Sequence, residues 1–212
     1  MSGRFITVEG IEGVGKSTNV RWLAERLRAR GIDVLLTREP GGTPLAERLR
    51  DVLLHADEAV PPVAELLLMF AARAVHLENQ IRPALAAGRW VLCDRFTDAT
   101  RAYQGGGRGE AGERIEQLAD WVHGDLSPTR TLLLDAPVDV ALGRTRGRGS
   151  EDRFERESRA FFGRVRERYL AIAAREPARV VTVDATAPLA EVQDRLAQII
   201  DELVENEKYN NQ

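Results

Sequence analysis

The stretch Gly10-Ile11-Glu12-Gly13-Val14-Gly15-Lys16-Ser17 decides how this chain folds. Its spacing, Gly-x4-Gly-Lys-Ser, lets backbone N–H groups turn inward around phosphate oxygens, and the helix that follows adds its positive end. Residues 5–8 form an apolar run before it, and Val20, Leu23 and Leu27 recur after it at helical spacing. The sequence therefore predicts a phosphate-binding loop, or P-loop, between a strand and a helix.

Lysine usage singles out Lys16. Of the 30 basic residues, only Lys16 and Lys208 are lysines, and the second lies in a polar tail. We expect Lys16 to reach the terminal phosphates of a nucleoside triphosphate and Ser17 to offer a hydroxyl to Mg²⁺. The residues expected around the phosphates are Gly10, Ile11, Glu12, Gly13, Val14, Gly15, Lys16, Ser17 and Thr18.

Length and composition limit the number of domains and the classes of partner that the chain can have. The chain has 212 residues, of which 43% are hydrophobic and 30% charged, so we expect one α/β domain over residues 1–212. The net charge of −3 argues against binding nucleic acid or an anionic membrane through bulk charge. No apolar run is long enough for a membrane span or signal segment. One cysteine, Cys93, excludes an intramolecular disulfide framework and favours a cytoplasmic location.

Short apolar segments alternate with helical patterns along the chain. The segments expected as strands are residues 5–8, 32–37, 90–93, 131–134 and 179–183, and helices are expected at 44–55 and 63–87, among others. This alternation predicts a five-stranded parallel sheet with helices on both faces, as in the P-loop NTPase fold. Ligands of such sheets bind beyond the carboxyl ends of the strands.

Three more segments fall at that edge and could hold a second anionic ligand. Residues 37–43, TREPGGT, follow the second strand, Asp94 and Arg95 end the third, and residues 103–109, YQGGGRG, read as a flexible glycine loop. Each alone could be a solvated loop with a local ion pair. Their common location favours an acceptor site, and the absence of an Asn-Lys-x-Asp segment argues against a GTPase. We therefore expect a small phosphotransferase.

An arginine-rich segment at about residues 143–153 is expected to form a lid. Arginine alternates there with small residues, which is unfavourable for a packed helix and suits a mobile cover. Arg144, Arg148 and Arg153 are the expected lid cations, because phosphoryl transfer needs positive charge near the γ-phosphate. The arginines from Arg156 to Arg168 alternate with acids and are interpreted as a solvated face.

From residue 5 to about residue 203, the chain resembles the bacterial thymidylate kinases of the nucleoside monophosphate kinase superfamily. The resemblance rests on VEGIEGVGKST, TREPGGTPLAE, LLMFAAR, RPAL, VLCDRF, YQGGGRG and the DRFE after the lid. It implies the reaction ATP + dTMP → ADP + dTDP with Mg²⁺, in dTTP biosynthesis, carried out by cytoplasmic homodimers. Whether the peptide bond before Pro40 is cis stays open on sequence alone.

The same resemblance implies roles for individual residues. Glu12 would hold the sugar 3′-hydroxyl of dTMP and help organise the metal, and Asp94 would lie near the metal. Because Glu12 is not basic, the catalytic arginine would come from the lid, with Arg153 as first choice and Arg148 as second. Lys16 and Arg95 complete the expected catalytic set. The residues expected at dTMP are Glu12, Arg38, Glu39, Pro40, Arg50, Phe70, Arg73, Arg95, Thr100, Tyr103 and Gln104.

Two departures from the family pattern concern the base site. Relatives often have a base-stacking phenylalanine four residues before the thymine-reading arginine, whereas here that position is Met69 and the aromatic is Phe70. Both share a helix face with Arg73, so Phe70 could still stack, and a core role is an equal alternative. Phe96 stands where relatives often have Tyr or His.

Two other functions stay open on sequence alone. A kinase of the same architecture could use another acceptor, such as a different monophosphate or a nucleoside. A nucleotide-binding subunit without turnover could keep the P-loop, although Lys16, Asp94, Arg95 and the lid argue against it. A panel of acceptors separates these alternatives.

Overall fold

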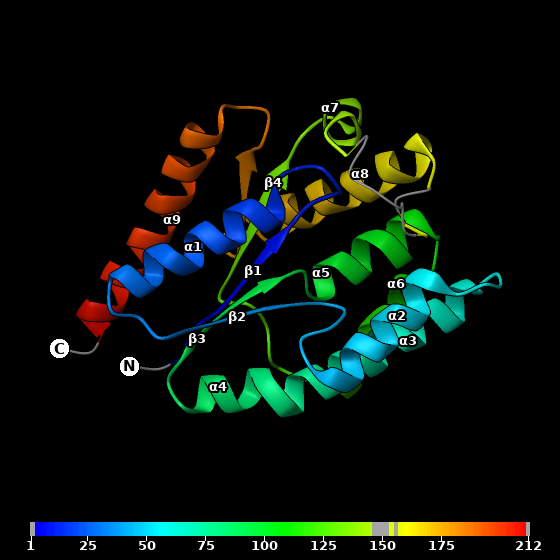
Figure 1. The fold of residues 1–212 in the computed structure, drawn as a ribbon, viewed down its shortest axis with the longest axis horizontal. Helices are drawn as coiled ribbons and strands as arrows, with labels where there is room; N and C mark the ends of the chain where they lie inside the picture. Colours follow the sequence, from blue (N-terminus) through cyan, green and yellow to red (C-terminus); the bar gives the residue numbers. More distant parts are fainter. Residues whose placement is uncertain (1–2, 146–152, 155–156, 211–212) are drawn as a thin grey trace.

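Five parallel strands form one sheet in the order β2-β3-β1-β4-β5 (Figure 1). The computed structural model describes residues 3–145, 153–154 and 157–210, with side chains described as far as residue 205. The strands are β1 (Phe5–Glu9), β2 (Val34–Arg38), β3 (Trp90–Asp94), β4 (Arg130–Asp135) and β5 (Val180–Asp184). All five predicted strands are confirmed, and so is the α/β architecture.

Helices cover both faces of this sheet. The α-helices are α1 (Lys16–Ala29), α2 (Pro44–His55), α3 (Pro62–His76), α4 (Arg82–Ala86), α5 (Thr97–Thr100), α6 (Gly112–Val122), α7 (Val138–Gly143), α8 (Arg159–Arg175) and α9 (Leu189–Asn210), and the π-helices are η1 (Leu77–Ile81) and η2 (Arg101–Gly107). Helices α1 and α9 lie together on one face, and α4 and α8 pack against strands of the sheet on the other (Figure 1). Among the described residues, no helix is long and apolar enough to cross a membrane.

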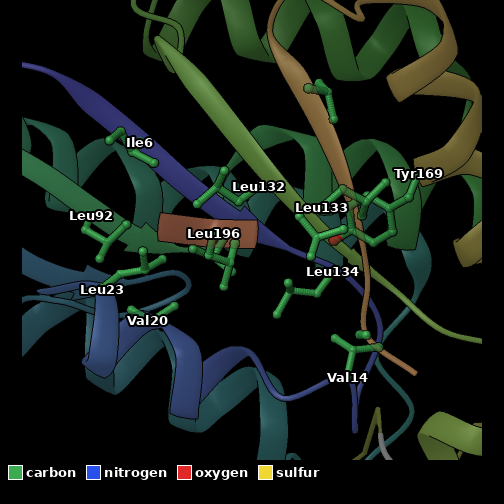
Figure 2. Packing of buried hydrophobic residues seen from close by; sticks show 14 of the residues in the cluster. Ile6, Val14, Val20, Leu23, Leu92, Leu132, Leu133, Leu134, Tyr169 and Leu196 are labelled. Carbon is green, nitrogen blue, oxygen red and sulfur yellow. The ribbon is translucent and has the colours of Figure 1, made fainter. Parts of the chain in front are cut away.

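The alternation of side chains along the central strands builds the two sides of the core. Ile6 of β1 and Leu92 of β3 pack with Leu23 of α1 and Leu196 of α9 (Figure 2). Phe5 of β1 belongs to a second buried cluster, with Leu77, Val91 and Cys93 among its members. Because both faces are buried, the strands are apolar almost throughout, as expected for a parallel sheet.

Two element boundaries differ from the prediction for local reasons. Strand β2 begins at Val34 rather than at residue 32, because Gly31 is left-handed (φ 76°) and the Ile32 N–H caps α1 through the Leu27 carbonyl. The helix expected at 63–87 is interrupted by η1, just before Pro83. Proline has no N–H and its ring clashes with the carbonyl four residues earlier, which favours a local widening of the helix there.

The glycine segment after Tyr103 is helical, so the prediction of a flexible loop was wrong. Residues 101–107 form η2, which packs against α8. A Cβ on Gly107 would lie 2.4 Å from the Phe161 ring, and one on Gly106 would lie 2.8 Å from Arg168 Cβ. These glycines therefore permit a close helix–helix approach rather than mobility.

Candidate active site

Glycine is required at two turns of the P-loop by close contacts. Gly10 (φ 134°) and Gly13 (φ 80°) have positive φ. A Cβ would lie 2.3 Å from the Leu134 carbonyl oxygen at Gly10 and 1.9 Å from the Ala141 carbonyl oxygen at Gly13. Gly15 caps α1 without a side-chain hydrogen bond, so the helix presents its N-terminal N–H groups to an anion.

The Lys16 side chain folds back toward the start of the P-loop. Its ammonium donates to the carbonyl oxygens of Gly10 (3.0 Å) and Ile11 (2.8 Å), and the side chain is buried. Burial and the positive charge of Arg95 lower the pKa of Lys16 to about 8. The ammonium is thus held at the P-loop by two neutral carbonyl oxygens, where a phosphate could supply a directly bonded anion.

Arg95 joins the end of β3 to the P-loop. Its guanidinium lies 2.8 Å from the Glu12 carboxylate and donates to the hydroxyls of Tyr103 (3.0 Å) and Tyr169 (3.2 Å). Tyr103 donates in turn to Glu12. Burial alone would raise the pKa of Glu12, but Arg95 and Lys16 outweigh it and keep that pKa below its usual value. Glu12 and Arg95 are therefore both charged, and the two tyrosine hydroxyls help to hold them in place.

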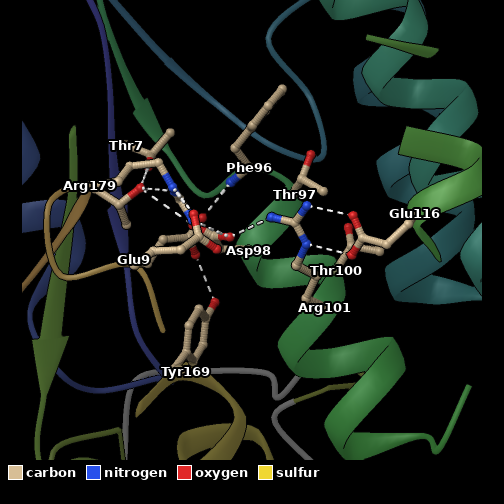
Figure 3. A network of polar contacts seen from close by, with 12 residues as sticks. Thr7, Glu9, Phe96, Thr97, Asp98, Thr100, Arg101, Glu116, Tyr169 and Arg179 are labelled. Atoms are coloured by element: carbon tan, nitrogen blue, oxygen red, sulfur yellow. Dashed lines mark hydrogen bonds and ion pairs between the residues drawn. The ribbon is translucent and has the colours of Figure 1, made fainter. Parts of the chain in front are cut away.

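Glu9 accepts hydrogen bonds from two neighbours of Arg95, the Phe96 N–H and the Tyr169 hydroxyl. Arg95 has a left-handed backbone (φ 74°), and the next N–H, that of Phe96, donates to Glu9 Oε1 at 2.7 Å. Tyr169 donates to Glu9 Oε2, also at 2.7 Å (Figure 3). Burial and the negative charge of Asp98 raise the pKa of Glu9 to about 8. Glu9 therefore fixes both the strained backbone of Arg95 and one hydroxyl partner of its side chain.

Asp94 lies beside the P-loop at the end of β3. It lines the same cleft as Lys16 and Ser17, and its Oδ1 is buried with no hydrogen-bond partner among the described residues. No group of three or more His, Cys, Asp or Glu side chains that could hold a metal occurs in that part of the chain. One carboxylate and a hydroxyl beside a phosphate site are nevertheless a typical protein contribution to Mg²⁺, which takes its other ligands from phosphates and water.

Two residues of the TREPGGT segment, Glu39 and Pro40, are held by arginines from elsewhere in the chain. The Glu39 carboxylate accepts from Arg73 Nε (2.7 Å) and contacts His76 Nδ1 (3.0 Å). These two partners outweigh burial and lower the pKa of Glu39. The Glu39–Pro40 peptide is cis, and Arg50 donates to the Pro40 carbonyl oxygen at 3.0 Å.

Two cavities meet at these residues. The P-loop cleft holds about 910 Å³ of empty space, lined by Glu12, Gly13, Gly15, Lys16, Ser17, Thr18, Arg38, Glu39, Arg50, Asp94, Arg95 and Thr145. The second cavity, of about 580 Å³, is lined by Glu12, Glu39, Pro40, Arg50, Leu54, Met69, Arg73, Arg95, Phe96, Ala99, Thr100, Tyr103, Gln104 and Phe154. Glu12, Glu39, Arg50 and Arg95 line both. Ligands in the two cavities would therefore meet at Arg95.

Most residues predicted at the acceptor line one of these cavities, and Phe70 does not. Its side chain is 2% exposed and packs with Leu66 and Ile115, whereas Met69 lines the second cavity. The Arg73 guanidinium lies 4.9 Å from the Phe70 ring centre, so Phe70 contacts the predicted base-reading residue. The side chain that borders the cavity from this helix is thus Met69.

The predicted lid is described only at its ends. Arg148 lies outside the described residues. Arg144 donates to the Ala185 carbonyl oxygen at 2.7 Å. Arg153 donates to the Leu53 carbonyl oxygen (3.0 Å) and pairs with Glu65 (2.6 Å), and it is not among the residues that line the P-loop cleft.

Sequence reasoning missed four buried polar residues of the site: Glu9, Glu65, His76 and Tyr169. Glu9 had a signal, since a carboxylate at the carboxyl end of a buried strand needs a partner. Glu65, His76 and Tyr169 lie on helical faces that read as core or solvated surface. Their partners are 37 to 160 residues away in sequence, so no local pattern marks them.

Comparisons with known proteins identify relatives of this chain by sequence and by fold. The sequence model of the family described as Thymidylate kinase matches residues 8–196. A thymidylate kinase of Pseudomonas fluorescens is 61% identical over 206 residues, and one of Pseudomonas syringae pv. tomato is 60% identical; each match covers 97% of this chain and 98% of the relative. The crystal structure of thymidylate kinase from Ehrlichia chaffeensis aligns with a TM-score of 0.77 at 33% identity, covering 94% of this chain and 99% of that one.

Proposed function

The chain belongs to the thymidylate kinase family, and we propose that it transfers the γ-phosphoryl group of ATP directly to dTMP, forming ADP and dTDP. The observation that carries this proposal is the junction of the two cavities at Glu12, Glu39, Arg50 and Arg95. One cavity has the P-loop chemistry for a triphosphate, and the other is the more apolar space that a nucleobase needs. Their shared residues bring a donor and an acceptor phosphate together.

The donor phosphates bind the P-loop. Its N–H groups and the start of α1 supply partial positive charge, and the ammonium of Lys16 supplies a full one. Ser17 and Asp94 fit Mg²⁺, since the buried Asp94 Oδ1 has no hydrogen-bond partner among the residues that the structure describes. When bound, Mg²⁺ neutralises charge on the transferring phosphates.

The acceptor phosphate binds at the junction. Arg95, Arg50 and the more exposed Arg38 offer guanidinium groups to it, and Arg38 is held at 2.9 Å from Glu47. The sugar lies between Glu12 and Tyr103, whose side chains are hydrogen-bonded to each other. The thymine enters the second cavity, where Arg73, Thr100 and Gln104 meet its polar edge.

The reaction needs positioning and charge stabilisation more than base catalysis. A phosphate oxygen of dTMP is already anionic; it forms a bond to the γ-phosphorus in line as the bond to the β–γ bridging oxygen breaks. Lys16 stabilises the transferring group and Arg95 aligns the acceptor. Arg153 is the first choice for the lid cation and Arg148 the second. For this role, Arg153 must break its ion pair with Glu65 and contact the transferring phosphates instead.

A homodimer in the cytoplasm is the proposed state of the protein. Helices α3 and α6 pack together, and each carries a large apolar side chain in solvent: Leu67 is 52% exposed and Trp121 is 84% exposed. Covering such side chains against a second copy would remove apolar surface from water. Sedimentation equilibrium of the native protein and of Trp121→Glu tests this assignment.

ADP release from ATP and Mg²⁺ tests the function. The acceptors dTMP, dUMP, dCMP, dGMP and the ribose form TMP are offered separately at equal concentration. A clear preference for dTMP supports the proposal. Strong preference for another acceptor would keep the phosphate chemistry and overturn the base-site assignment. Binding of ATP without turnover on any acceptor would overturn the catalytic role.

A further inference from the structure

Glu65 is a fully buried carboxylate that no step of the proposed reaction uses. It lies on α3 and accepts hydrogen bonds from Gln104 Nε2 (2.8 Å), Arg108 Nε (3.2 Å) and Arg153 Nη2 (2.6 Å). These partners come from η2, from the residue after it and from the far end of the predicted lid. Burying a carboxylate costs desolvation free energy, which the three donors must offset. We therefore ask what the arrangement of these donors does.

The contact with Glu65 decides which end of the Gln104 amide is free. The Glu65 carboxylate accepts hydrogen bonds from two guanidinium groups, so the Gln104 group that donates to the same carboxylate is the NH₂. The oxygen Oε1 then turns away from Glu65. Gln104 lines the second cavity, and its Oε1 accepts no hydrogen bond from a described residue. Gln104 therefore offers an acceptor to a ligand there.

Arg73 offers the complementary group. Its Nε and Nη2 are occupied by Glu39 (2.7 Å) and Thr100 (3.0 Å), whereas Nη1 is buried and has no acceptor in the described part of the chain. The guanidinium also lies 4.9 Å from the ring centre of Phe70 and 5.0 Å from that of Phe96, and these contacts restrict its movement. Arg73 and Gln104 both line the second cavity, and each thus keeps one hydrogen-bonding atom without a partner in the described part of the chain: an N–H donor on Arg73 and an oxygen acceptor on Gln104.

This pair matches one kind of pyrimidine edge. A ring with a 4-carbonyl beside an N3–H, as in thymine, accepts from Arg73 and donates to Gln104. A ring with a 4-amino group beside an unprotonated N3, as in 5-methylcytosine, places donor against donor and acceptor against acceptor. A reversed Gln104 amide would remove half of this distinction. The orientation of that amide therefore contributes to base selectivity.

We propose that Glu65 is a positioning residue for base selectivity: by holding the NH₂ of Gln104, it presents Oε1 to the N3–H of the acceptor base. The inference rests on the proposed function, because it assumes that a pyrimidine monophosphate occupies the second cavity. It assigns the discrimination between 4-oxo and 4-amino pyrimidines to a residue that does not line that cavity.

The test compares kcat/KM for dTMP and 5-methyl-dCMP, which differ only at this edge, in the full chain and in Glu65→Gln. The variant removes the charge that fixes the amide and lets either end of Gln104 face the base. We expect the dTMP preference to fall about 10-fold or more, mainly through the KM for dTMP. Arg108→Gln is the matched control, since it alters another Glu65 partner and leaves the Gln104 contact; its preference should stay that of the native protein.

A purely structural role for Glu65 would lower kcat/KM for both nucleotides equally, and an unchanged preference in Glu65→Gln would overturn the inference. Gln104→Leu gives a second test should Glu65→Gln fold poorly. Gln104→Leu should lose the same preference for dTMP. The double variant should lose no more of that preference than either single variant. A Gln104→Leu protein that keeps the full preference for dTMP would also overturn the inference. A native protein that does not phosphorylate dTMP would instead contradict the proposed function.

Discussion

The guanidinium of Arg95 and the carboxylate of Glu12 form an ion pair of 2.8 Å that links the third strand in the chain to the P-loop. Both residues line both cavities. The pair holds Arg95 in place without a ligand, although Arg95 has a left-handed backbone that costs free energy. Positive charge is thus already aimed at the junction, so little reorganisation is needed when an acceptor phosphate arrives.

Replacing Lys16 by Met should reduce turnover about 100-fold or more, because the transferring group loses a fixed positive charge. The measurement is kcat for ADP release at saturating ATP and dTMP. Lys208→Met is the matched control, since it removes the other lysine of the sequence, and its kcat should equal that of the native protein. Near-native turnover in Lys16→Met would show that Lys16 is not part of the catalytic machinery.

ATP affinity should fall as the pH rises above about 8. The pKa of Lys16 in the free protein is about 8, so the ammonium is present below that pH and is lost above it. Because ATP binds the charged form, its dissociation constant should rise toward 10-fold per pH unit beyond that point. Titration calorimetry between pH 7 and pH 9.5 measures this slope, and Lys16→Met should lack it. Equal slopes in the two proteins would place the titration elsewhere.

Glu9 should make the native protein less stable as the pH rises from 5 to 8. Its pKa is raised from 4.5 to about 8 in the folded state, so the folded protein binds more protons than the unfolded one over this range. The free energy of unfolding then falls with pH, by up to about 1.4 kcal/mol per pH unit for this single group. Glu9→Gln should remove that contribution.

Urea unfolding at each pH checks the prediction for Glu9. The native protein and Glu9→Gln should have similar free energies of unfolding near pH 4, where Glu9 is largely protonated in both the folded and the unfolded state, and should diverge between about pH 5 and pH 8, with the variant the more stable. Parallel pH curves for the two proteins would mean that Glu9 does not titrate in this range.

Much of this site could be predicted because parallel strands deliver their last residues to one edge. That rule predicts Asp94, Arg95 and the residues of TREPGGT at one edge, whereas Lys16 follows from the P-loop spacing. Glu65 could not be found in this way, since its three partners are 39, 43 and 88 residues away and meet it only in the folded chain. Gly106 and Gly107 show a similar limit: glycine for helix packing and glycine for a loop look alike in sequence.

Arg73 and Arg38 should differ in their contribution to stability. Arg73→Met leaves the buried Glu39 without its main cation and should lower the free energy of unfolding by about 3–5 kcal/mol. Arg38→Met breaks an exposed pair with Glu47 and should cost less than about 1 kcal/mol. Urea unfolding at pH 7 compares them. Equal losses in the two variants would contradict the buried ion-pair cluster described here.

Arg153→Ala should lower kcat much more than the affinity for dTMP, if Arg153 acts on the transferring phosphoryl group. Single-turnover kinetics at saturating dTMP measures transfer, and equilibrium titration measures dTMP binding. The assigned role is wrong if dTMP affinity collapses while the rate of the bound complex stays intact. Because Arg153 also contacts Glu65, the dTMP preference over 5-methyl-dCMP is recorded in the same variant.

The most direct measurement follows the γ-phosphoryl group itself. ATP labelled with ¹⁸O in the γ-phosphate is incubated with the protein, Mg²⁺ and dTMP, and the products are identified by mass spectrometry. The account predicts that the label appears in dTDP, that ADP forms in an amount equal to the dTDP, and that little labelled inorganic phosphate forms. Labelled inorganic phosphate with unchanged dTMP would contradict it, because the γ-phosphoryl group would then have been transferred to water.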